Sequence, residues 1–77
     1  MIIKVLGTGC TNCKKLEKNA REAVKVLGIN ADIEKVEDFM EIMKYGVMKT
    51  PALVVDDKVI VMGRIAKAEE IKEHLTQ

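Results

Sequence analysis

The chain has few or no residues of several types that particular functions require. Its 77 residues include no tryptophan, one histidine, one proline and two cysteines. Thirteen Lys and Arg against twelve Asp and Glu leave a net charge of +1, which argues against nucleic acid or an anionic membrane as a partner. No apolar run approaches the roughly 20 residues of a membrane-spanning helix, and the first apolar segment is not a signal peptide. We therefore expect a cytoplasmic protein without a membrane partner.

No composition shift, internal repeat or low-complexity stretch divides the chain. Residues 1–77 are therefore expected to form a single domain with a modest hydrophobic core. We also expect a monomer.

The two cysteines stand close together, in the segment Cys10-Thr11-Asn12-Cys13. Residues 2–6 have the pattern of a short buried strand, and residues 11–27 that of an amphipathic helix. Cys10 is thus predicted at the start of a helix, where unpaired backbone N–H groups and the helix dipole favour a negative charge. A lowered pKa at this position would make Cys10 a thiolate nucleophile.

Cys13 belongs to the apolar face of the same predicted helix. The other members of that face are Leu16, Ala20, Ala23, Val24 and Leu27. We therefore expect Cys13 to face the core while Cys10 faces outward. One exposed thiol and one sheltered thiol suit a nucleophile and the thiol that later displaces its substrate.

The middle of the chain continues with alternating strands and helices. Residues 31–36 alternate apolar and charged side chains, which predicts a second strand. Glu37 and Asp38 then predict an acidic helix start, and Gly46 a helix end. The residues expected to face inward from this helix are Phe39, Met40 and Met43. For Met48, which follows the helix, core packing is likewise the favoured interpretation.

The last part of the chain predicts a hairpin and a helix. Apolar runs at 52–55 and 59–62 flank Asp56-Asp57-Lys58, and residues 67–76 form a final amphipathic segment. The inward residues of that segment are Ala68, Ile71 and Leu75. The order βαβαββα predicts an α/β fold, a four-stranded mixed sheet with helices on both faces.

Metal binding is the main alternative to redox chemistry for the cysteine pair. Zinc requires three or four ligands, and the only additional imidazole, His74, is expected to lie exposed near the end of the last helix. Two thiolates can bind a soft ion such as Cu(I), so a Cu(I)-type metal-delivery protein stays open as a second hypothesis.

The Cys-x-x-Cys segment, the βαβαββα order and Thr50-Pro51 before the third strand together resemble the thioredoxin superfamily, in particular its small redox-active disulfide proteins. Residues 45–53 resemble the thioredoxin segment that leads from a helix through a cis-proline into the next strand. The resemblance covers nearly the whole chain. It implies a thiol:disulfide oxidoreductase that needs no metal or other cofactor.

The resemblance also implies residue roles and partners. Cys10 would attack a disulfide, Cys13 would resolve the intermediate, and Pro51 would be cis and packed against the disulfide. The substrate-binding residues that it implies are Thr50, Pro51, Thr11, Asn12 and Gly63. The partners would be protein disulfides and a reductase that supplies electrons.

The sequence departs from the thioredoxin pattern at three places. Thr8-Gly9 stands where thioredoxins carry a tryptophan, and Asn12 stands where they carry a proline. Residues 2–6 contain Lys4 but no acid, whereas thioredoxins have a buried acid in this strand that helps to deprotonate the resolving cysteine. The sequence therefore leaves open which group accepts the proton of the resolving cysteine.

Overall fold

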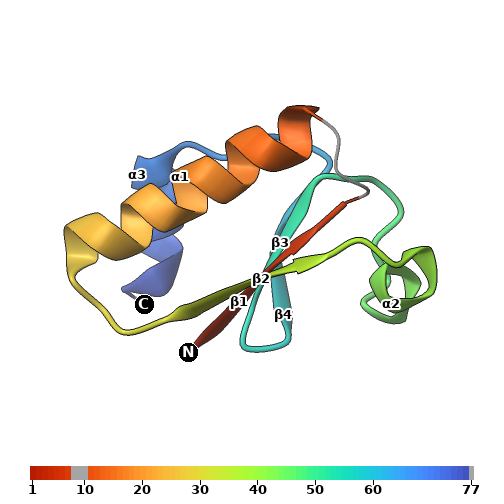
Figure 1. Ribbon diagram of the computed structural model, residues 1–77, viewed down its shortest axis with the longest axis horizontal. Coiled ribbons are helices and arrows are strands. Elements are labelled where there is room, and N and C mark those ends of the chain that lie inside the picture. The colour runs from red at the N-terminus through yellow and green to blue at the C-terminus, as the bar shows by residue number, and fades with distance from the viewer. Residues whose placement is uncertain (8–10, 77) are drawn as a thin grey trace.

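Four strands form one mixed sheet within residues 1–7 and 11–76, which a computed structural model describes. The elements follow the order β1 (Ile2–Leu6), α1 (Thr11–Leu27), β2 (Asp32–Val36), α2 (Phe39–Lys44), β3 (Ala52–Val55), β4 (Lys58–Met62) and α3 (Ala68–Leu75). The strands lie in the order β2-β1-β3-β4, with β1 parallel to β2 and antiparallel to β3 (Figure 1). The predicted βαβαββα fold is confirmed.

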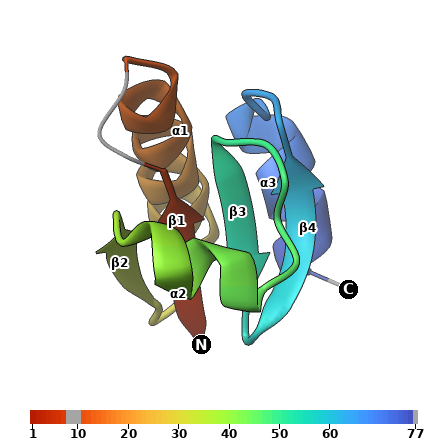
Figure 2. The same ribbon diagram turned by 90° about the vertical axis from the view of Figure 1, so that its right-hand side faces the viewer.

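The helices cover both faces of the sheet, as predicted. Helices α1 and α3 pack on one face, and α2 lies on the other (Figure 2). The larger core, between the sheet and α1 and α3, contains Ile3, Val5, Leu16, Ala20, Ala23, Leu53, Val61, Ala66, Ile71 and Leu75. The smaller core beneath α2 contains Leu6, Ile42, Val47, Ala52 and Val54. Strand β3 supplies both cores, which explains why its sequence is apolar throughout rather than alternating.

A tight turn joins β3 to β4. Asp56 and Asp57 both adopt positive φ values, 48° and 67°, which a two-residue hairpin with right-handed strand twist requires. The backbone N–H of Asp56 donates to the carbonyl of Ile2 at 2.9 Å, and its carboxylate accepts from the N–H of Ile2 at 2.9 Å. The turn is therefore attached to the start of β1.

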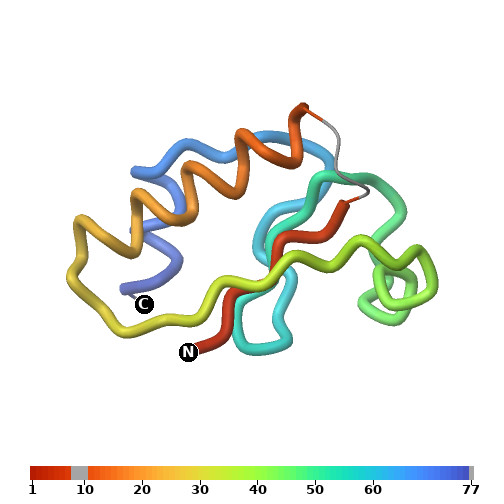
Figure 3. Tube along the Cα trace, viewed as in Figure 1, coloured from red at the N-terminus to blue at the C-terminus, as the bar shows by residue number. Residues whose placement is uncertain are grey.

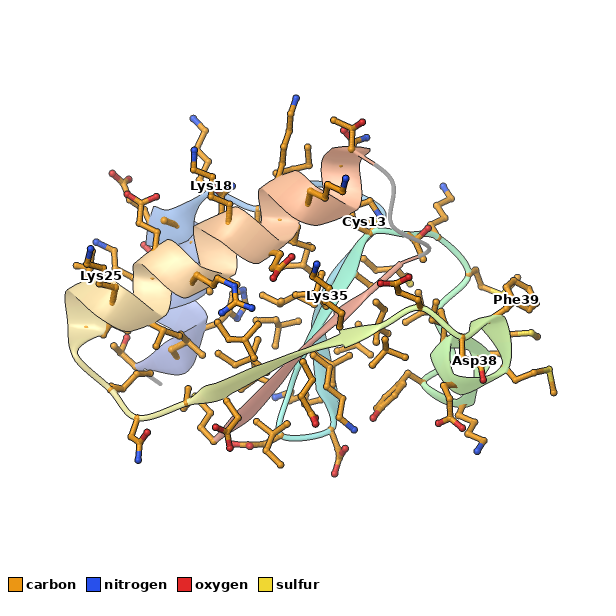
Figure 4. All side chains as sticks on the ribbon, viewed as in Figure 1. Cys13, Lys18, Lys25, Lys35, Asp38 and Phe39 are labelled. Carbon is orange, nitrogen blue, oxygen red and sulfur yellow. The ribbon has the colours of Figure 1, made fainter. Side chains whose placement is uncertain are left out.

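Helix α2 is turned differently from the sequence prediction. Ile42 is its buried residue, at 3% exposure, whereas Phe39, Met40 and Met43 are exposed by 65%, 67% and 52%. At about 100° per residue, a six-residue helix that directs Ile42 to the sheet must direct Met40 to the opposite side. The prediction that Phe39, Met40 and Met43 face inward is wrong. Figure 4 shows Phe39 projecting away from the rest of the molecule.

Two further side chains differ from expectation. Met48 is 87% exposed, because its neighbour Val47 takes the inward position in the smaller core. His74 is half-buried rather than exposed, on α3 next to Val55 and Ile60 of the hairpin strands. Neither residue has the surroundings that its sequence position alone predicted.

None of the helices formed by residues 1–7 and 11–76 has both the length and the hydropathy needed to cross a membrane.

Candidate functional site

The end of β1, which precedes the Cys-x-x-Cys segment, and the Thr50–Pro51 segment lie at the same end of the sheet. In the antiparallel pairing of β1 with β3, Leu6 at the end of β1 lies opposite Ala52 at the start of β3. Gly7 therefore leaves β1 beside the point where Pro51 enters β3. Figure 3 shows the chain from α2 into β3 passing the end of β1, next to the start of α1. The sheet register thus unites segments about forty residues apart in sequence.

Cys13 lies in the first turn of α1, is 6% exposed and forms a disulfide bond. Its inward position on the helix agrees with the sequence prediction. Cys10, the only other cysteine of the sequence, lies outside the described residues together with Thr8 and Gly9. The prediction that Cys10 stands at the helix start therefore concerns a part of the chain that the structure does not describe.

Gly7 is buried directly against Cys13, a contact that the sequence analysis missed. A Cβ atom at Gly7 would overlap the Cys13 Sγ atom and would lie 3.1 Å from the Cys13 Cβ and 3.9 Å from the Thr50 Cβ. The N–H of Gly7 also donates a hydrogen bond to the carbonyl of Val36, at the end of β2, at 2.9 Å. Only a residue without a side chain fits between β1, Cys13 and Thr50.

The Thr50–Pro51 peptide bond is cis, as the resemblance implied. Pro51 is buried and Thr50 is exposed. The N–H of Gly63, at the end of β4, donates to the carbonyl of Pro51 at 2.9 Å. Gly63 has φ 76°, and a Cβ there would lie 3.0 Å from the Lys49 Cβ, so a glycine suits this position.

The remaining expected surface residues lie close to Cys13 in the chain. Thr11 and Asn12 open α1 and are both exposed. Arg64, next to Gly63, forms a bidentate ion pair with Glu70 of α3, with one Nη1–Oε1 distance of 2.8 Å. Arg64 is thereby held toward α3. The charged side chains nearest to Cys13 and Thr50 in the chain are Lys14 and Lys49, which are both exposed.

Lys4, in the strand where thioredoxins carry an acid, belongs to the opposite face of the sheet. Its Nζ donates to the Tyr45 hydroxyl at 2.6 Å and lies 4.0 Å from the Asp57 carboxylate. The hydrogen bond to Tyr45 raises the pKa of the ammonium group. Lys4 therefore stays charged, and its side chain lies on the face of the sheet that α2 covers, away from Cys13.

Two glutamates, Glu17 and Glu37, line a small pocket beside Cys13, and one of them comes from the same helix. Glu17, one turn after Cys13 on α1, lines the same small pocket, together with Lys35 of β2. The spacing of four residues between Cys13 and Glu17 could have indicated this pair from the sequence. No sequence signal could have placed Lys35, because it arrives from a different strand. In the described part of the chain, no cluster of three or more His, Cys, Asp or Glu side chains could hold a metal ion.

Comparison with known proteins agrees with this geometry. The family model described as a thioredoxin domain matches residues 1–76. The chain is 51% identical to the thioredoxin of Methanothermobacter thermautotrophicus over 76 residues, which covers 99% of both chains. It is 43% identical to the thioredoxin of Methanocaldococcus jannaschii over 75 residues, covering 97% of this chain and 86% of the relative. Similarity of this extent, over the whole length, is sufficient to establish a family.

Proposed function

The chain belongs to the thioredoxin family, whose general chemistry is thiol–disulfide redox exchange, and from this premise we propose that it is a thiol:disulfide oxidoreductase acting on protein disulfides through Cys10 and Cys13. The observation that carries the proposal is the buried, disulfide-bonded Cys13, whose Sγ atom lies directly against Gly7, the residue that follows β1. A sulfur so enclosed can exchange with a sulfur of its own chain but is shielded from a second protein.

The roles of the two cysteines follow from this difference in access. Thiol–disulfide exchange requires a thiolate to reach a sulfur in line, so a protein substrate cannot easily reach a buried sulfur. Cys10 is therefore assigned the attack on the substrate disulfide. Cys13 is assigned the second step, in which its thiolate attacks Cys10 of the mixed disulfide and releases the reduced substrate.

The proposed substrate surface surrounds this pair. Thr50 and Pro51 would receive an extended substrate segment alongside the start of β3, by backbone pairing of the strand-addition type. The exposed Thr11 and Asn12 would border it on one side. Gly63 would border it on the other, where its N–H is already bonded to Pro51 and so supports the surface rather than pairing with substrate. A reductase would return the electrons, and the protein would work in the cytoplasm as a monomer.

The test uses single-cysteine variants and a model disulfide. Cys13→Ser should accumulate a mixed disulfide through Cys10, whereas Cys10→Ser should form none, and mass spectrometry of the intact protein distinguishes the two. Trapping through Cys13 in the Cys10→Ser protein would reverse the roles. Tight, stoichiometric Cu(I) retention against a chelator, without turnover of insulin disulfides, would replace the proposal with metal delivery.

The direction of the reaction requires a separate measurement. A reduction potential of about −270 mV for the cysteine pair would indicate a reductant, and one of about −120 mV an oxidant. Equilibration with glutathione or dithiothreitol buffers of known ratio gives this value.

A further inference from the structure

A small pocket opens beside Cys13, between α1 and the strands β1 and β2. Its volume is about 70 Å³, enough for a water molecule. The residues that line it are Val5, Gly7, Cys13, Lys14, Glu17, Lys35 and Glu37. Figure 4 shows Lys35 extending from β2 toward the helix that carries Cys13. The pocket therefore joins the resolving cysteine to a small group of charged side chains.

Glu17 is the carboxylate held most firmly in this pocket. Its side chain is 14% exposed, and its two oxygens have different partners. One oxygen accepts hydrogen bonds from Arg21, at 3.0 Å from Nε and 2.8 Å from Nη2, and the other lies 3.2 Å from the Lys35 Nζ. Because Cys13 and Glu17 are four residues apart on one helix, their side chains project from the same face, about 5–6 Å apart at Cβ.

Glu17 is ionised, which is the form that can receive a proton, and its ion pairs make it a weaker base than an unpaired carboxylate. Partial burial raises the pKa of its carboxyl group, but the hydrogen bonds from Arg21 and Lys35 outweigh this, so the pKa lies below its ordinary value. Arg21 comes from α1 and Lys35 from β2, while Lys14 and Glu37 complete the charged groups at the pocket. Glu17 is therefore an ionised carboxylate throughout the neutral pH range.

The resolving step requires a proton acceptor, because a thiol reacts as its thiolate. We propose that Glu17 accepts the proton of the Cys13 thiol, directly or through one water in the pocket, when Cys13 resolves the mixed disulfide. This inference rests on the proposed function. It assigns the deprotonation of Cys13 to a residue of α1, because β1 contains no acidic side chain.

Glu17 takes the proton from Cys13, and the Cys13 sulfur uses its freed electron pair to form a bond to the Cys10 sulfur. The bond between Cys10 and the substrate sulfur breaks, and its electron pair leaves with the substrate thiolate. The cysteine pair is oxidised, the substrate disulfide is reduced, and the Glu17 proton passes through the pocket to solvent or to the departing thiolate. Lys35 acts as a positioning residue, because it orients the carboxylate without touching the reacting atoms.

The experiment separates the two steps with Ellman's reagent, an aromatic disulfide. Reduced protein should release one thionitrobenzoate when Cys10 attacks and a second when Cys13 resolves, and stopped-flow absorbance follows both phases. Glu17→Gln should slow the second phase by about tenfold or more, within the range of general base catalysis, and leave the first phase within about twofold. The matched controls are Glu22→Gln, exposed on the same helix, and Glu37→Gln, exposed at the pocket rim.

Two further readouts distinguish proton transfer from a structural effect. The second phase of Glu17→Gln should become steeper with pH between about 6 and 8, because hydroxide must replace the carboxylate. In Glu17→Ala, added formate should restore part of the rate by entering the pocket. Lys35→Met should slow the second phase less than Glu17→Gln does, and Lys35→Arg should recover it.

The outcomes separate this inference from the function on which it rests. Release of a single thionitrobenzoate by the wild-type protein would overturn the proposed function itself. Two phases in the wild type, with a second phase in Glu17→Gln that equals that of Glu22→Gln, would overturn the role of Glu17 alone. A second phase slowed by Glu37→Gln and not by Glu17→Gln would assign the proton to the other carboxylate and would equally refute the inference.

Discussion

Gly7→Ala is the sharpest test of how the site is packed. Gly7 adopts no positive φ, so alanine fits the backbone, but its methyl group would overlap the Cys13 Sγ atom. This sulfur is not the free end of a flexible side chain, because it is disulfide-bonded. Inserting a methyl group into packed surroundings costs about 1–3 kcal/mol, and replacing glycine returns about 0.4–1 kcal/mol through the unfolded state. The two ranges combine to a net loss of about 0 to 2.6 kcal/mol, with a central value of about 1.3 kcal/mol.

The loss should be visible in stability and in redox behaviour. For a domain of this size, 1 kcal/mol corresponds to about 4–8 °C in Tm, so we expect the oxidised variant to melt several degrees lower. In the reduced protein, the Cys13 side chain can rotate by about 30° away from its rotamer at a cost of about 0.5–1.5 kcal/mol, which relieves part of the overlap. The variant should therefore lose less stability when reduced, and its disulfide should become easier to reduce.

A double-mutant cycle tests whether the Sγ contact is the cause. In a Cys13→Ala background the sulfur is absent, and the penalty of Gly7→Ala in urea unfolding should fall by at least half, relative to the oxidised protein. The remaining Cβ–Cβ approach of 3.1 Å explains a small residual penalty. Equal penalties in both backgrounds, or no penalty in either, would refute the reasoning.

Two further predictions concern α2 and the Glu17 ion pairs. Ile42→Ala should destabilise the protein by about 2–5 kcal/mol, because Ile42 is the buried residue of α2. Met43→Ala should change the free energy of unfolding by no more than about 0.5 kcal/mol, because Met43 is exposed. Similar losses for the two variants in urea unfolding would contradict the observed helix orientation. The pKa of Glu17 is lower in the folded protein than its ordinary value, so its contribution to stability is present above about pH 4.5 and lost as the pH falls through the folded pKa. Between about pH 7 and 3, the free energy of unfolding should therefore fall less steeply with decreasing pH for Glu17→Gln than for the wild type. An equal pH dependence of the two proteins would contradict this.

Much of the fold could be predicted from the sequence because its elements have strong local patterns. The α1 segment has a long apolar face with charged residues elsewhere, and its bounds were predicted to the residue. Strand β3 and its hairpin were predicted from two apolar runs around a short acidic turn. In such segments, the periodicity of apolar side chains along the chain is enough to predict which face is buried.

Local patterns failed where an element is short. Phe39, Met40, Ile42 and Met43 cover nearly half of the circumference of a six-residue helix, so hydrophobicity alone could not say which part of that arc meets the sheet. The orientation is decided by the partners beneath it, Leu6 and Val54 of the sheet among them. For the same reason Met48 could not be distinguished from a core residue until Val47 was seen in the inward position.

The sequence by itself determined the cysteine spacing, the order of elements and the inward face of α1 on which Cys13 lies. Only the tertiary structure decided what surrounds Cys13, because its neighbours come from separate elements. Gly7 lies against its Sγ atom at the end of β1, and Lys35 lines its pocket from β2. Thr50, shortly before β3, also approaches Gly7. Their proximity depends on strand register and helix packing, which join residues far apart in the chain and leave no periodic trace in the sequence.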